Sequence, residues 1–100
     1  MASKNILDMI NYSEGGILSK VIFKGDKTQT TLFSMAANTE ISEHTSSKEG
    51  YVYVLEGDGI FNLEGKDIGM AEGTLINMSK NAKHSLFAKK NTSFLLILTE

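Results

Sequence analysis

The chain contains no cysteine and no proline, and all ten of its basic residues are lysine. Without cysteine there is no disulfide framework, no thiolate metal site and no thiol nucleophile. Without arginine the chain lacks the planar fork that binds carboxylates and phosphates through two parallel hydrogen bonds. Lysine and backbone amides remain as groups that can hold a small anion. Without proline, the turns must be made by glycine, asparagine and aspartate.

The chain also has little net charge and no long hydrophobic run. The formal net charge is −2 and no basic block appears, so nucleic acid is not an expected partner. The longest apolar run, Phe94–Leu98, is far shorter than a membrane span. The first ten residues contain no apolar stretch long enough for a secretory signal. We therefore expect a cytoplasmic protein with no membrane partner.

What the chain does contain is a series of short β-rich segments. Its 100 residues, 41% of them apolar, predict one domain over residues 1–100 with a modest core. Strands are expected at residues 16–23, 30–36, 51–55, 60–63, 73–78, 85–88 and 93–99, with turns at 24–27 and 64–66. Residues 57–59 predict a hairpin in which residues 60–63 form the returning strand. Only residues 4–12 look at all helical, and we expect residues 1–14 to form an arm or an edge strand. Short strands at this spacing predict an all-β sandwich or barrel.

The two histidines are the residues most suggestive of chemistry. His44 precedes a valine-rich strand that ends at Gly57, and His84 follows the strand that begins at Gly73. Histidine is the commonest protein ligand of transition metals. Because each histidine borders an alternating strand, both side chains can point into one barrel.

These residues resemble the cupins, a family of double-stranded β-helix (jelly-roll) barrels. His44 and Gly57 match positions of the first cupin motif, and Gly73 and His84 match positions of the second, each at the family's separation. The 15 residues between the motifs resemble the short spacer of compact microbial cupins. The resemblance covers about half of the chain. It implies a cupin barrel and, in many members, a bound metal and a dimer.

Several motif positions depart from the family pattern. Asn38 and Asn81 replace glycines, a mild change because asparagine tolerates a left-handed backbone. Ser46 stands where the family has its second histidine, and Gly50 stands where it has a glutamate. In addition, Ser79 replaces the proline and Ala88 the asparagine of the second motif. Of the metal ligands that the resemblance implies, only His44 and His84 are present.

A third metal ligand has to come from elsewhere. Glu49 lies one residue before the expected glutamate, so it needs a bulge or a loop to reach the cavity, and Glu43 has the wrong parity beside His44. His44 and His84 are thus candidate ligands for Zn, Mn, Fe, Ni or Cu, with Glu49 as a possible third. The alternatives are a structural histidine pair, or two donors that hold an anionic ligand.

Alternation predicts which residues share a face. The ligand cavity is expected to be lined by His44, Ser46, Gly50, Val52, Val54 and His84. Met78 and Phe87 are candidates for the cavity mouth. Tyr51 and Tyr53 then point outward. Residues 94–98 are apolar on both faces, so this strand either lies centrally between the sheets or meets another subunit with its outer face. Together with the dimers that the cupin resemblance implies, this predicts a homodimer formed by sheet-to-sheet packing.

Three functional hypotheses follow from this sequence. The first is a cupin barrel that binds a small molecule, with or without a weakly held divalent metal. The second is a metal-dependent enzyme of the dioxygenase or isomerase kind. The third is a structural or interaction protein whose cavity is closed. The residues do not identify a substrate, because one barrel hosts many unrelated activities.

Overall fold

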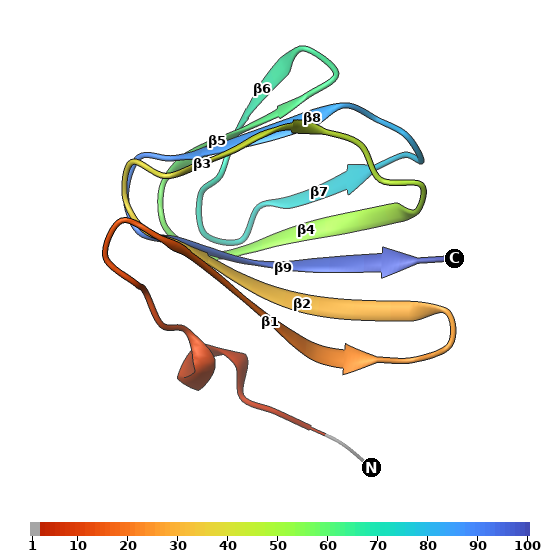
Figure 1. Ribbon diagram of the computed structural model, residues 1–100, viewed down its shortest axis with the longest axis horizontal. Coiled ribbons are helices and arrows are strands. Elements are labelled where there is room, and N and C mark those ends of the chain that lie inside the picture. The colour runs from red at the N-terminus through yellow and green to blue at the C-terminus, as the bar shows by residue number, and fades with distance from the viewer. Residues whose placement is uncertain (1–2) are drawn as a thin grey trace.

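A computed structural model describes residues 3–100 of the chain and shows an all-β architecture (Figure 1). The elements in chain order are a short 3-10 helix η1 (Ile6–Met9) and strands β1 (Ile17–Lys24), β2 (Thr28–Met35), β3 (Glu40–His44), β4 (Glu49–Glu56), β5 (Gly59–Leu63), β6 (Lys66–Gly69), β7 (Leu75–Met78), β8 (His84–Ala88) and β9 (Thr92–Thr99). The predicted all-β class is confirmed.

The strands form two antiparallel sheets that face each other as a jelly-roll barrel. A five-stranded sheet has the order β1-β2-β9-β4-β7, and a four-stranded sheet has the order β3-β8-β5-β6. Figure 1 shows the four-stranded sheet above the five-stranded one. Strands distant in sequence are neighbours, so β9 at the end of the chain pairs with both β2 and β4. This crossing of strands brings the two halves of the sequence around one core.

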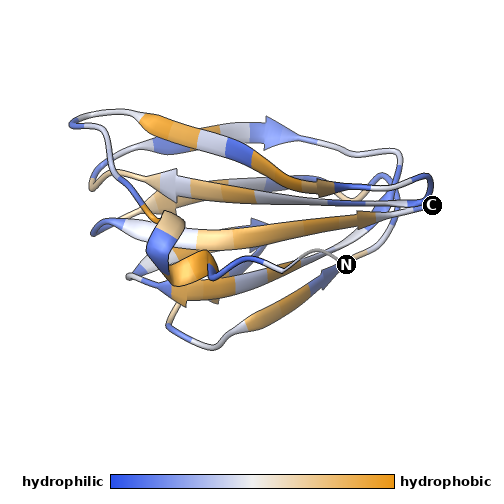
Figure 2. Cartoon of the chain, turned by 90° about the horizontal axis from the view of Figure 1, so that it is seen from below, coloured by the Kyte–Doolittle hydropathy of each residue, from blue (hydrophilic) through white to orange (hydrophobic). Residues whose placement is uncertain are grey.

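Period-two alternation decides which residues enter that core. Along β4, Val52 and Val54 are buried while Tyr51 and Tyr53 are more than a third exposed, as the sequence predicts. The same alternation appears as bands of hydrophobic and hydrophilic colour along the strands in Figure 2. The core cluster consists of Met35, Val52, Val54, Phe61, Met70, Ile76, Met78, Leu86, Ala88 and Phe94. It fills the space between the two sheets.

Two strands fall outside the expected segments. The sequence suggested no strand at β3, where apolar residues are sparse, and only the edge of a turn at β6. Both occupy sheet edges or exposed surfaces, where polar residues weaken the alternation signal. Asn38 and Asn81 adopt the left-handed backbone expected where they replace glycine, with φ angles of 67° and 64°.

The N-terminal arm packs on the outer face of the five-stranded sheet. Tyr12 is its anchor: its hydroxyl donates to Glu56 Oε2 at 2.8 Å and accepts from Ser93 Oγ at 2.7 Å. Burial raises the pKa of Tyr12 to about 12, and the carboxylate of Glu56 adds to this. Within the described residues, the predicted arm is therefore held against the sheet by hydrogen bonds and does not form an edge strand of it. Residues 1 and 2 of that prediction lie outside the described residues.

No helix within residues 3–100 is of a length and apolarity that would let it cross a membrane.

Candidate functional site: a histidine pair at the barrel cavity

A cavity of about 90 Å³ remains between the two sheets, and both histidines border it. Its walls are formed by Phe33, Ile41, His44, Val52, Phe61, Met78, His84, Leu86, Phe94 and Leu96. Eight of these ten side chains are apolar, so the two imidazoles are the only polar side chains of the wall. The centroids of the two rings lie 4.0 Å apart. This is the place where the barrel offers both an enclosed volume and polar chemistry.

An irregularity in β3 brings His44 to the cavity. His44 and His84 are paired opposite each other at the end of the β3–β8 ladder, and the register shifts between Ile41 and His44. Residues three apart in a regular strand face opposite sides, yet Ile41 and His44 both line the cavity. The shift reverses the parity, as a β-bulge does. A local distortion of β3 therefore positions one half of the site.

Each imidazole is held by a backbone carbonyl two residues earlier. His44 Nδ1 lies 2.8 Å from the carbonyl oxygen of Ser42, and His84 Nδ1 lies 3.0 Å from that of Ala82. The other ring nitrogen, Nε2, has no hydrogen-bond partner within residues 3–100, and no buried side-chain nitrogen there is left unpaired. Nε2 is therefore the ring nitrogen of each histidine that no described protein group occupies.

The two histidines differ in exposure. His84 is only 6% exposed and stacks on Phe61, with ring centroids 5.7 Å apart and planes 4° from parallel, whereas His44 is exposed. Burial lowers the pKa of His84, and the neighbouring His44 lowers it further, while the carbonyl of Ala82 opposes the shift. The neutral form of His84 is therefore the form that the fold favours.

This shift predicts a loss of stability in acid. A histidine whose pKa is lower in the folded state contributes stability above its unfolded pKa of about 6.5, and the contribution is lost as the pH falls through the folded value. We expect the urea midpoint to fall between about pH 7 and pH 5. The midpoint of His84→Gln should change less over the same range. If the urea midpoints of wild type and His84→Gln fell equally between about pH 7 and pH 5, His84 would not be the source of the acid sensitivity.

Ser46 does not lie on the cavity wall, contrary to expectation. The sequence reasoning placed it on the same face as His44, but β3 ends at His44 and Ser46 belongs to the loop before β4. Its hydroxyl accepts a hydrogen bond from the backbone N–H of Lys48 at 3.2 Å, and its carbonyl accepts one from Asn81 at 2.7 Å. Strand alternation cannot be extended through a loop, so Ser46 stabilises the turn instead.

Gly50 also creates no room for a ligand. It is buried, and a Cβ atom at this position would lie 2.8 Å from Leu98 Cδ2 and 3.0 Å from the carbonyl oxygen of Ile97. The space of the missing glutamate is therefore already filled by β9. The absence of a side chain at Gly50 therefore relieves crowding against β9.

The other residues that the sequence placed at the cavity lie in three different places. Val52 and Met78 line the cavity, but Val54 is fully buried in the core behind it. Phe87 is 37% exposed and lies on the outer face of the four-stranded sheet. The wall residues that the sequence reasoning missed are Phe33, Ile41, Phe61, Leu86, Phe94 and Leu96. Their alternation marked them as core, and nothing in the sequence separated the cavity wall from the rest of the core.

The carboxylates proposed as a third metal ligand are not beside the imidazoles. Glu49 is exposed at the start of β4 and alternates with the buried Gly50 and Val52, which puts it on the opposite face. No group of three histidine, cysteine, aspartate or glutamate side chains in residues 3–100 is arranged to hold a metal ion. Tight zinc or iron sites usually take three or four protein ligands. The residues present do not fit that kind of centre.

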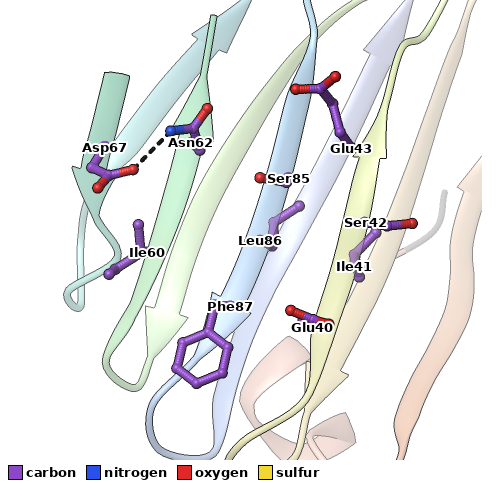
Figure 3. Close-up of a pocket in the computed structure, with 10 residues that line it drawn as sticks. All are labelled: Glu40, Ile41, Ser42, Glu43, Ile60, Asn62, Asp67, Ser85, Leu86 and Phe87. Carbon is purple, nitrogen blue, oxygen red and sulfur yellow. Dashed lines mark hydrogen bonds between the residues drawn. The ribbon is translucent and has the colours of Figure 1, made fainter. Parts of the chain in front are cut away.

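A larger hollow of about 480 Å³ lies on the outer face of the four-stranded sheet. Figure 3 shows its lining, with Glu43 and Glu40 along β3, Phe87 on β8, and Asp67 on β6 accepting a 2.8 Å hydrogen bond from Asn62. Glu43 therefore belongs to this outer hollow. The hollow is open to solvent and lacks the imidazoles, so the smaller cavity between the sheets is the candidate functional site.

Comparisons with known proteins agree with this architecture. The cupin domain model matches residues 31–99. A conserved protein of unknown function from Streptococcus pyogenes is 22% identical with a TM-score of 0.88, over 99% of this chain and 87% of that chain. An RmlC-like cupin protein from Desulfovibrio desulfuricans is 20% identical with a TM-score of 0.89, over 99% and 96%. A mutant salicylate 1,2-dioxygenase from Pseudoaminobacter salicylatoxidans is 15% identical with a TM-score of 0.78, over 90% and 28%.

A comparison with curated protein sequences gives no significant match. The solved structures share the fold with this chain, and their low identities carry no activity across to it. The domain match extends from β2 to β9 and includes both histidines. The predicted resemblance is thus confirmed, and the chain belongs to the cupin family.

Proposed function

We propose that this protein binds a small molecule in the cavity between its sheets. The observation that carries the proposal is the wall itself: two imidazoles whose Nε2 atoms have no hydrogen-bond partner within residues 3–100 border an otherwise apolar volume of about 90 Å³. Ligand sites in proteins typically combine apolar walls with a few placed polar groups. A purely structural barrel gains nothing from keeping this volume open, because filled cores are more stable.

A thermal-shift screen of small metabolites tests this proposal. A ligand present at ten times its Kd should stabilise the protein by roughly 1.4 kcal/mol, which corresponds to about 5–10 °C for a domain of this size. We expect His84→Ala to lose this shift, because it removes one of the two polar groups of the wall. Phe87→Ala, on the outer face, is the matched control and should keep it.

Two results of the screen would count against binding. If no compound in a broad metabolite set stabilises the wild type, the cavity is closed and the protein is better described as a structural or interaction cupin. If a ligand shifts wild type and His84→Ala equally, it binds elsewhere on the molecule.

A metal-dependent enzyme is the second candidate. The observation in its favour is that two imidazoles with ring centroids 4.0 Å apart border one cavity, where His44 and His84 can share a weakly held divalent metal with water or with the bound molecule. Because a third protein ligand is missing, we expect well under one metal ion per chain after purification without chelator and after removal of any histidine tag. Elemental analysis by mass spectrometry checks this. One Mn, Fe, Ni, Cu or Zn per chain would favour the enzyme.

We also propose that the protein is a homodimer joined through the outer face of the five-stranded sheet. Leu75, Tyr53, Leu95 and Leu32 form one apolar row across β7, β4, β9 and β2 in the observed register. Tyr51 and Ile97 are paired in the next row. The N-terminal arm covers the β1–β2 side of this face, since Met9 and Leu32 border one pocket there, and it leaves Leu75 and Tyr53 63% and 40% exposed. A second copy would bury these side chains.

A further inference from the structure

We infer that the cavity takes a neutral ligand that has a compact apolar body and donates a hydrogen bond to the histidine pair. This inference rests on the proposed small-molecule function and specifies its ligand class. It reverses one alternative raised by the sequence, in which two imidazole donors hold an anion. The deciding observation is the partner of each Nδ1 atom.

The hydrogen bonds fix the tautomer of both rings. A carbonyl oxygen can only accept a hydrogen bond, so Nδ1 of His44 must donate to Ser42 and Nδ1 of His84 must donate to Ala82. In a neutral imidazole the second nitrogen then carries a lone pair and no proton. Each ring therefore offers a hydrogen-bond acceptor, Nε2, to the cavity ligand.

No other side chain of the wall supplies a donor. The eight remaining wall residues carry hydrocarbon side chains or, at Met78, a thioether. An anion placed here would meet two lone pairs and an apolar surface, and it would lose its hydration without compensation. A hydroxyl group attached to a hydrocarbon body has the opposite properties. Its O–H donates a hydrogen bond to an imidazole nitrogen, and its hydrocarbon part packs against the apolar wall.

The shape of the cavity favours a small flat body. A volume of about 90 Å³ corresponds to roughly three water molecules, and the cavity opens to solvent beside the exposed His44, so a single small ring can enter it with one edge left in solvent. Phe61 lies parallel to His84, and Phe33 lies parallel to Phe94 with ring centroids 5.1 Å apart. These parallel rings give the wall flat surfaces. Phenol is a suitable probe because it joins a flat ring to a single donor.

The test compares three probes of similar shape at about pH 8, where His84 with its lowered pKa is neutral. Phenol has a hydroxyl donor, anisole replaces it by a methyl ether without a donor, and benzoate carries an anionic acceptor. Kd values from NMR titration of the wild type are expected to show phenol binding about 2–12-fold more tightly than anisole, the range for one hydrogen bond. Benzoate is expected to bind at least about tenfold more weakly than phenol.

A variant and a control connect the preference to the histidine. His84→Phe keeps a ring at this position and removes one of the two acceptors, so the preference for phenol over anisole should be smaller than in the wild type. Phe87→Leu, outside the cavity, should keep the wild-type ratio. If His84→Phe does not fold, the tautomer is measured directly on the wild type by nitrogen-15 NMR of the imidazoles, where protonated Nδ1 and unprotonated Nε2 are expected at both rings.

The outcomes separate this inference from the function on which it rests. If benzoate or anisole binds as tightly as phenol, or if the rings carry their proton on Nε2, the ligand class is wrong and the binding function survives. If none of the three probes changes the signals of the cavity residues, both the ligand class and the binding site are overturned.

Discussion

Replacing Phe61 with alanine is expected to lower the free energy of unfolding by about 3–5 kcal/mol. Phe61 is 1% exposed, belongs to the central core cluster and also forms part of the cavity wall against His84. Alanine would remove the ring and enlarge the existing cavity, and the two sheets cannot close around the loss. Urea denaturation of wild type and variant measures the difference.

The chain offers a matched control for this change. Phe87 lies on β8, the strand that pairs with β5, but its side chain is on the outer face and 37% exposed. Phe87→Ala should therefore cost well under half as much as Phe61→Ala. If Phe61→Ala does not fold, Phe61→Leu provides a milder variant, expected to lose about 1 kcal/mol or somewhat more. Equal losses at Phe61 and Phe87 would show that the core is not organised as described.

The second large effect concerns association. The double variant Tyr53→Lys, Leu75→Lys is expected to be a monomer at micromolar concentration, where the wild type should have twice the mass of one chain. Both side chains are solvent-exposed in the single chain, so the substitutions should leave the fold intact. In a dimer, however, they would place four unpaired lysines in an apolar interface. Light scattering after size-exclusion chromatography measures the mass.

A control on the other sheet separates a specific interface from general stickiness. Phe87 is exposed to nearly the same extent as Tyr53, but it lies on the outer face of the four-stranded sheet. Phe87→Lys should therefore leave the dimer unchanged. A wild-type protein that elutes and scatters as a monomer at micromolar concentration would contradict the proposed dimer. A dimer disrupted by Phe87→Lys but not by the double variant would place the interface on the opposite sheet.

The sequence predicted the fold because its signals are local or are carried by motif spacing. Alternation along residues 51–55 correctly separated the buried valines from the exposed tyrosines. Glycine and aspartate at residues 57–59 correctly marked the end of β4, but the hairpin predicted there is wrong, because β4 and β5 belong to different sheets. The separations of His44 from Gly57 and of Gly73 from His84 identified the cupin barrel. Each of these features depends on neighbours in the chain, so it can be seen without the tertiary structure.

The composition of the site was decided by tertiary structure. Whether His44 faces the cavity depends on a register shift in β3 that has no sequence signal, and Ser46 lies in a loop because β3 ends at His44. Whether Gly50 opens a pocket depends on Leu98, a residue from β9 that lies 48 positions later in the chain. The sequence determined by itself which residues are apolar and which two are histidines. Only packing between distant strands decided which of them surround the cavity, because contacts across the barrel depend on register and side-chain volume rather than on local pattern.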